Sequence, residues 1–303
     1  MWRCDDGCES CHALSSLDVV TILLSLGTSF FFGCADFLGG VAARRDSAFI
    51  VTATSHLAGG LLLVPFLFFL LPQASVGSAD IAWGAVAGVS GGLGVAALYG
   101  ALAVGRMSVV APITAALSGA LPAAFDMLQG NAVGPLVIVG MILAIAAVVL
   151  VSVSIEDEED MHDGYHPTRS IVLAVIAGTG FAGGITAFSL TAPESGFWPL
   201  LAARTVSVLL IGSIALARRG HLRLARPAVA PTLSAGTLEM VANYTMITAI
   251  RIGPLSIAAV LGSLYPIVVV MLARTFLHER LKPMQWAGAT LAIVAVLLMA
   301  LPS

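Results

Sequence analysis

Ten long apolar segments separated by short polar breaks run through this sequence. They cover residues 19–41, 48–71, 80–103, 108–129, 133–154, 170–191, 196–217, 230–250, 254–275 and 283–301. A helix needs about 20 mostly apolar residues to cross the hydrocarbon core of a bilayer, and continuous runs favour helices over barrel strands. The breaks contain turn-forming residues, as at Gly130-Asn131 and Gly253-Pro254. The pattern predicts an all-α membrane protein with ten transmembrane helices.

Composition and charge narrow the function classes. Hydrophobic residues make up 58% of the 303 residues and charged residues 10%, and the mean hydropathy is +0.99. A soluble domain carries roughly a quarter charged residues, so these values argue against a water-soluble enzyme. The formal net charge is −3, and the chain has no basic stripe with interleaved aromatic residues, so we expect no nucleic-acid partner.

A gap-free internal repeat relates the two halves of the chain. A shift of 148 residues aligns 80–153 with 228–301. The most informative identities involve glycine, serine and proline: Gly88/Gly236, Gly105/Gly253, Ser108/Ser256, Pro135/Pro283 and Gly140/Gly288. Because each half holds five apolar segments, an odd number, the second half begins on the opposite side of the membrane. The sequence therefore predicts two inverted five-helix repeats, an arrangement common in transporters.

Six acidic residues within 156–163 mark a solvated loop at the midpoint. The chain is therefore expected to have four parts: an N-terminal tail (1–17), a first repeat (18–154), an acidic linker (155–168) and a second repeat (169–303). The tail carries a cluster of possible metal ligands: Cys4, Cys8, Cys11 and His12. No second segment completes such a site, so we expect no metal. Acidic residues precede the first apolar segment where a signal peptide has basic ones, so that segment is expected to stay as a helix.

Basic residues gather in the loops on one side of the predicted membrane helices. The loops after segments one, three, five, seven and nine carry ten of them: Arg44, Arg45, Arg106, Arg169, Arg218, Arg219, Arg223, Arg226, Arg280 and Lys282. The other side has Arg3 and Arg251. The positive-inside rule places the basic loops in the cytoplasm and both termini outside it.

Four short motifs follow one another in the second half: Gly253-Pro254-Leu255-Ser256, Tyr265-Pro266, Leu277-His278-Glu279-Arg280-Leu281 and Gln285-Trp286-Ala287-Gly288. This series resembles the signature of an EamA domain of the drug/metabolite transporter superfamily. The resemblance covers roughly 18–303 and implies two tandem five-helix repeats that transport small organic metabolites, amino acids or drugs, often outward. The first half departs from the signature, because Asn131 stands where Glu279 stands in the second. Members of the family are usually described with cytoplasmic termini, so the orientation stays open.

A second resemblance concerns the first apolar segment. Ala35-Asp36-Phe37-Leu38-Gly39, followed by Arg44, is similar to the first helix of small multidrug resistance proteins, in which a glutamate exchanges protons for cationic drugs. The similarity implies a proton-coupling or substrate-binding role for Asp36. The residues leave a second interpretation open, in which Asp36 lies close enough to the membrane surface to pair with Arg44 or Arg45.

Other ionisable residues lie inside the apolar segments, where a charge is costly unless it faces a wet cavity or a partner. Glu239 is near the centre of its segment, with Asn243 one turn later and Tyr244 beside it. We expect Glu239 to couple protons and this polar stripe to bind substrate; hydrogen bonds to a neighbouring helix are the alternative. Arg204 is a candidate counter-ion for Glu239 or Asp126, or a ligand for a substrate carboxylate, or else it extends to the membrane surface.

Three aromatic residues complete the predicted binding site. Tyr99 and Tyr265 could offer ring faces to an amphipathic or cationic ligand, and Trp83 could reach the mouth of a cavity. Packing between helices is the alternative for the tyrosines, and anchoring at the membrane interface is the alternative for Trp83.

The sequence favours a secondary transporter that works by alternating access, driven by protons, in the cell membrane. Its partners would be a small-molecule substrate, protons and lipid, and we expect a monomer or weak homodimer without a cofactor. A non-transporting receptor or scaffold would need neither the buried acids nor the repeat. An intramembrane enzyme acting on lipids would need a paired catalytic constellation at membrane depth, and the chain has no H-E-x-x-H motif.

Overall fold

The computed structural model describes residues 9–70, 74–128, 134–153, 165–252, 261–262 and 264–300, among which there is no strand. Their helices are α1 (Glu9–Ala43), α2 (Ala48–Leu70), α3 (Ser78–Val104), α4 (Met107–Leu128), α5 (Pro135–Val153), α6 (Pro167–Ser189), the 3-10 turn η1 (Pro193–Ser195), α7 (Trp198–Arg219), α8 (Arg226–Ile252), α10 (Tyr265–Phe276) and α11 (Pro283–Ala300). Helix α1 begins at Glu9, inside the expected tail, because 9–18 contains neither glycine nor proline to stop it.

Six of these helices are long and apolar enough to cross a membrane, namely α1, α2, α3, α4, α6 and α7. Shorter apolar stretches lie in α5, α10 and α11. Helix α8 is as long as α3, but Glu239 and Arg251 interrupt its apolar sequence. Large apolar side chains such as Leu23, Leu61 and Leu209 are 64–65% exposed on the outer surface. Contact of these apolar surfaces with lipid carries no hydrophobic free-energy cost, whereas contact with water would carry one.

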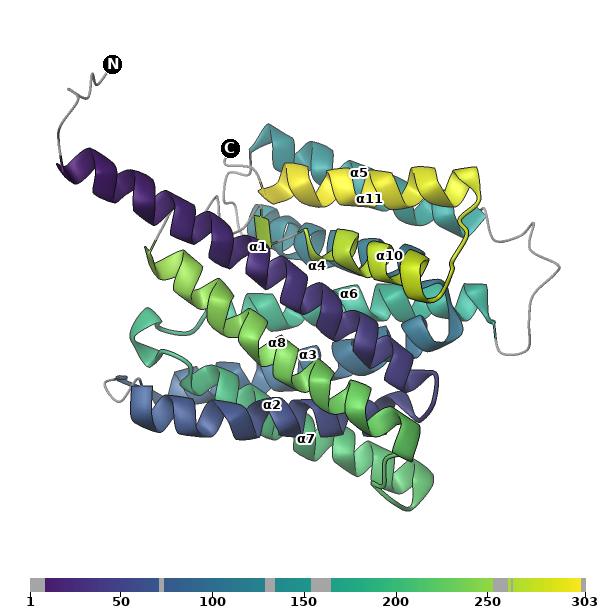
Figure 1. Ribbon diagram of the computed structural model, residues 1–303, viewed down its shortest axis with the longest axis horizontal. Helices are drawn as coiled ribbons and strands as arrows, with labels where there is room; N and C mark the ends of the chain where they lie inside the picture. The colour runs from purple at the N-terminus through teal and green to yellow at the C-terminus, as the bar shows by residue number, and fades with distance from the viewer. Residues whose placement is uncertain are drawn as a thin grey trace.

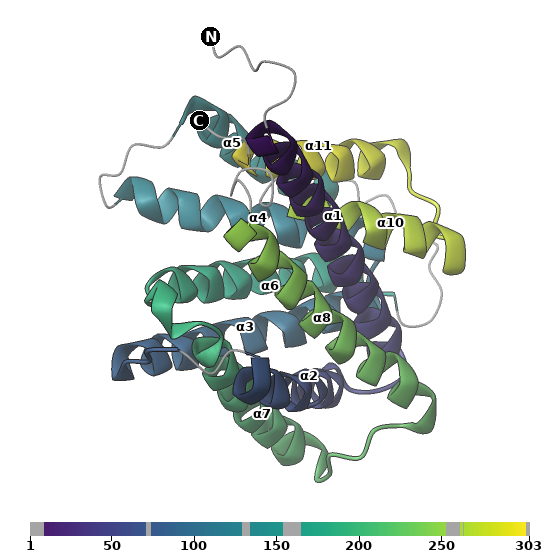
Figure 2. The ribbon, with the colours of Figure 1, turned by 60° about the vertical axis from the view of Figure 1, so that its left-hand side comes forward.

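The helices form two central layers with a flank on either side (Figures 1 and 2). Helix α1 lies along α8 in one layer, and α3 lies along α6 in the other. Helices α2 and α7 pair on one flank. On the other flank, α4 and α10 pack beside the layers, and α5 pairs with α11 farther out.

Two close helix contacts are related by the 148-residue shift of the internal repeat. A side chain added at Gly88 of α3 would run into the carbonyl oxygen of Ala203 in α7. A side chain added at Gly236 of α8 would run into the carbonyl oxygen of Ser55 in α2. Positions 88 and 236 differ by 148, and so do positions 55 and 203. Glycine lets the two backbones approach closely. A glycine of the first half makes such a contact with the second half, and a glycine of the second half makes the equivalent contact with the first.

The loops gather at two ends of the helices. The first, here called the arginine-rich end, comprises residues 44–47, 105–106, 220–225 and 277–282 and lies at the right in Figure 1. The second, here called the opposite end, comprises residues 74–77 and 190–197 and lies at the left. Each helix from α2 to α8 runs from one end to the other, so the position of a residue along its helix gives its depth between them.

Candidate functional site

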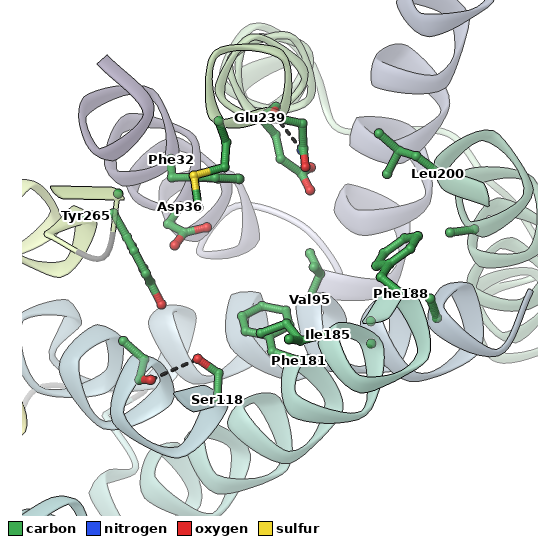
Figure 3. Close-up of a pocket in the computed structure, with 18 of the residues that line it drawn as sticks. Phe32, Asp36, Val95, Ser118, Phe181, Ile185, Phe188, Leu200, Glu239 and Tyr265 are labelled. Atoms are coloured by element: carbon green, nitrogen blue, oxygen red, sulfur yellow. Dashed lines mark hydrogen bonds between the residues drawn. The ribbon is translucent and has the colours of Figure 1, made fainter. Parts of the chain in front are cut away.

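A cavity of about 620 Å³ lies between the two central layers. Helices α1 and α8 line it on one side, and α3 and α6 line it on the other, with further contributions from α2, α4 and α7. Its wall is mostly apolar and includes Phe32, Phe181 and Phe188, with a small number of polar side chains (Figure 3). Its volume and lining are those of a pocket for a small organic molecule.

The cavity extends from the middle of the molecule to the opposite end. Phe188 is the penultimate residue of α6 and Leu200 belongs to the first turn of α7, and both side chains line the cavity next to that end. Toward the arginine-rich end, the lining stops at Asp36 and Tyr99, which lie one to two turns inside the ends of α1 and α3. The cavity is therefore closed on the side where the basic loops lie.

A polar network crosses the cavity wall between α2, α7 and α8. One guanidinium nitrogen of Arg204 donates to Oε1 of Glu239 at 2.5 Å. His56 Nε2 lies 3.9 Å from Oε2 of the same carboxylate, and His56 Nδ1 is 2.6 Å from the hydroxyl of Ser207. Arg204 is 7% exposed, so the ion pair lies in a medium that screens it weakly. The structure confirms that Arg204 and Glu239 meet, as the sequence suggested.

Asp36 faces the same cavity without a partner. Its carboxylate points into the open space near Tyr265 in Figure 3. No hydrogen bond or ion pair joins Asp36 to any of the described residues. The two arginines considered as surface partners are used elsewhere: Arg44 pairs with Glu279, and Arg45 donates to the carbonyl oxygen of Pro227. Asp36 is therefore a half-buried carboxylate that is accessible from the cavity.

Most of the predicted site residues line the cavity together. Asn243, Tyr99 and Tyr265 do so in addition to Asp36, Glu239 and Arg204. The amide of Asn243 also donates to the backbone oxygen of Glu239 at 2.8 Å, one turn earlier in α8. Tyr244 and Trp83 are not in the lining, and they are 44% and 37% exposed on the outer surface. A residue next to Asn243 is turned by about 100° around the helix, which carries Tyr244 out of the cavity.

Some lining residues carried little signal in the sequence. Gly91 and Gly92 of α3 leave room for the cavity, and a side chain added at Gly91 would meet no atom within 4 Å. The cluster of Gly91, Gly92 and Gly94 could have indicated a cavity wall, but it equally indicates close helix contact. Ser118 and Ser207 are single serines in apolar helices, a pattern common in any membrane protein.

The structure holds no candidate metal centre within its described part. No group of three or more histidine, cysteine or acidic side chains lies close enough there to bind an ion. The N-terminal cluster of Cys4, Cys8, Cys11 and His12 lies outside the residues whose side chains are described. Its role stays a prediction.

Comparison with known proteins places the second half of the chain in a family. Residues 168–301 match the EamA-like transporter family. The C-terminal half of the chain is an EamA domain. This match and the six apolar helices together support a multi-pass membrane protein, and the family matched by residues 168–301 is one of transporters. No curated protein matches the chain significantly.

The fold of the EamA domain and its N-terminal partner has been seen before. Fourteen chains of solved structures match. One, described as "Crystal structure of protein", has a TM-score of 0.61 and 13% sequence identity, with 92% of this chain and 95% of that chain covered. At this identity the likeness concerns the fold alone. Because the match covers both halves, the helices before the EamA domain belong to the same fold.

Proposed function

We propose that this protein is a secondary active transporter that exports small organic metabolites, amino acids or drugs across the cell membrane by alternating access. The observation that carries the proposal is a cavity enclosed by helices of both halves, containing a carboxylate, Asp36, that has no hydrogen-bond or ion-pair partner among the described residues. The 148-residue shift relates the contacts of Gly88 and Gly236, which supports two inverted five-helix repeats around this cavity. Inverted repeats that rock about a central site expose it to each side in turn.

The charges in the cavity favour a substrate with a cationic group. The cavity lining contains two carboxylates, those of Asp36 and Glu239, and one guanidinium, that of Arg204. Arg204 is paired with Glu239, which leaves the charge of Asp36 unbalanced. An ammonium group or a proton could balance it, and the phenylalanines could contact an apolar body. The proposed substrate is therefore an amphipathic amine, including amino acids, of a size that fits about 620 Å³.

Competition between a proton and the substrate at Asp36 would couple their movements. A carboxylate that holds a proton no longer attracts an ammonium ion, and one paired with an ammonium ion holds its proton less readily, so occupancy by one opposes occupancy by the other. Glu239 becomes a second carboxylate for a proton or substrate when its bond to Arg204 breaks during the conformational change. In this scheme, protons entering through the cavity drive the substrate out.

The test is transport in proteoliposomes under an imposed pH gradient, with a panel of amines, amino acids and drugs. We expect Asp36→Asn to abolish gradient-driven accumulation and Glu239→Gln to reduce it. The matched control is Glu194→Gln, which removes an exposed carboxylate at the opposite end, outside the cavity. If both cavity variants retain the flux of the unmodified protein, the coupling mechanism is wrong. Binding of ligands without any flux would instead favour a receptor.

A further inference from the structure

The carboxylate of Glu279 caps a helix that belongs to the other half of the chain. Its Oε1 accepts a hydrogen bond from the backbone N–H of Met107 at 3.0 Å, and its Oε2 accepts one from Ser108 at 3.1 Å. These are the first two residues of α4, whose N–H groups have no partner within their own helix. An anion at a helix N-terminus is also favoured by the helix dipole. Glu279 comes from the loop between α10 and α11, 172 residues away from Met107.

Arg44 joins this contact from the end of α1. Its guanidinium lies 3.4 Å from Glu279 Oε1 and also donates to the carbonyl oxygens of Leu102 and Gly105, each at 3.2 Å. The side chain of Glu279 is 9% exposed and that of Arg44 is 32% exposed, so the carboxylate is largely buried and the guanidinium still reaches water. One carboxylate thus ties the ends of α1 and α3 and the start of α4 to the second half.

The same end has a second polar tie of this kind. Arg106 donates to the side-chain oxygen of Gln285, which also accepts a hydrogen bond from the backbone N–H of Lys282 at 3.1 Å. Gln285 is 1% exposed. Glu279 and Gln285 both belong to the motifs of the EamA signature, and neither lines the cavity.

These ties lie between the closed end of the cavity and the solvent. Helix α1 carries Asp36 two turns before Arg44, and α4 carries Ser118 three turns after Ser108. For a substrate to leave at the arginine-rich end, the two halves must separate there, which pulls Glu279 away from the start of α4. The 148-residue shift places Asn131, a neutral residue outside the described part, at the equivalent position of the first half.

We propose that Glu279, held by Arg44, is a latch that keeps the arginine-rich end of the cavity shut, and that its release from α4 opens that end. The proposal rests on the proposed function, because a latch can act only if the cavity opens to the two ends in turn. It makes Glu279 a positioning residue rather than a substrate ligand.

The experiment measures access to the cavity rather than transport. Ser118→Cys, in a chain whose native cysteines are replaced, places a thiol in the cavity. A membrane-impermeant thiol reagent is added to right-side-out or inside-out vesicles. We expect labelling from the opposite end in the parent, and a labelling rate from the arginine-rich end that rises about tenfold in Glu279→Gln, because the charge-assisted bonds are lost. Glu194→Gln, the control at the opposite end, should leave that rate unchanged.

Unchanged access in Glu279→Gln would overturn the latch. If that variant does not fold, as judged by its elution from detergent, Arg44→Gln replaces it; this change breaks the ion pair and leaves the α4 cap in place. A smaller rise is then expected, and no rise again overturns the proposal. Labelling requires neither substrate nor a proton gradient. A chain without flux can therefore still show the latch, and a chain with normal flux can still fail to show it.

Discussion

The two ends of the molecule differ in how the halves are joined. At the arginine-rich end, Glu279 caps α4, Arg45 donates to the backbone of the second half, Arg106 bonds Gln285, and Asp46 accepts from the N–H of Ala225 at 2.6 Å. At the opposite end, the side-chain tie between the halves within the described ranges is that of Asp80, which accepts from the N–H of Ala192 at 2.7 Å.

This difference matches the extent of the cavity. The cavity reaches the end where the described residues make fewer side-chain ties and stops short of the end where they make more. Polar ties between preformed loops can break and re-form without unfolding a helix, since each is worth about 0.5–3 kcal/mol. The closed end also holds a buried apolar cluster that includes Phe37, Leu102 and Val269, so opening it must separate packed apolar side chains as well as break polar ties.

The largest expected effect is on stability, and it concerns the middle of the molecule, where Arg204 of α7 pairs with Glu239 of α8. Arg204→Ala leaves a carboxylate in the membrane interior without its counter-ion, and we expect a loss of about 3–5 kcal/mol in stability. The melting temperature in detergent measures it. The double variant Arg204→Gln with Glu239→Gln removes both charges and should recover most of the loss. A double variant no more stable than Arg204→Ala would show that packing, not charge, holds these helices.

A matched pair of aspartates tests the comparison of the ends directly. Asp46 accepts hydrogen bonds from Ser47 and Ala225 at the arginine-rich end, and Asp80 accepts them from Gly77 and Ala192 at the opposite end. Each carboxylate joins a loop of the first half to a loop of the second. Replacing either with asparagine removes a charge from two similar hydrogen bonds, so both variants should have lower melting temperatures.

Access to the cavity from the arginine-rich end should nevertheless differ between Asp46→Asn and Asp80→Asn. With the Ser118→Cys reporter, we expect Asp46→Asn to raise labelling from the arginine-rich end about threefold, because it weakens the closed side. Asp80→Asn should leave labelling from that end unchanged, since its own end is already open to the cavity. Equal changes in both variants would mean that the ties stabilise the fold without controlling access.

The sequence predicted the helices well because apolar length is a local property. Each helix that the structure describes overlaps a predicted segment. The cost of a lone charge in lipid indicated a partner for Arg204, and the structure selects Glu239 over the alternatives that the sequence left open. The role of Glu279 could not be read in this way. Its partners Met107 and Ser108 offer backbone N–H groups, which carry no sequence signature, and they lie in the other half of the chain.

The direction of side chains within a helix was also predicted incompletely. Asn243 and Tyr244 were assigned together to a polar stripe, and neighbours on a helix point about 100° apart. One of the two side chains therefore had to point away from the cavity, and the sequence alone did not show which one. In the structure Asn243 lines the cavity with Glu239, and Tyr244 lies on the outer surface. The boundaries of the two repeats stay predictions.

The smallest expected effect compares the inner and outer faces of the helices that surround the cavity. Tyr265 lines the cavity, and Tyr244 lies 44% exposed on the outside of α8. Removing the Tyr265 hydroxyl takes one hydrogen-bonding group from the substrate's surroundings, worth about 1 kcal/mol, so the KM of transport should rise about fivefold in Tyr265→Phe. Tyr244→Phe should change it less than about twofold, because its hydroxyl is outside the cavity. A larger effect at Tyr244 would mean that substrate reaches the cavity from the lipid side of α8, between the two ends rather than through either of them.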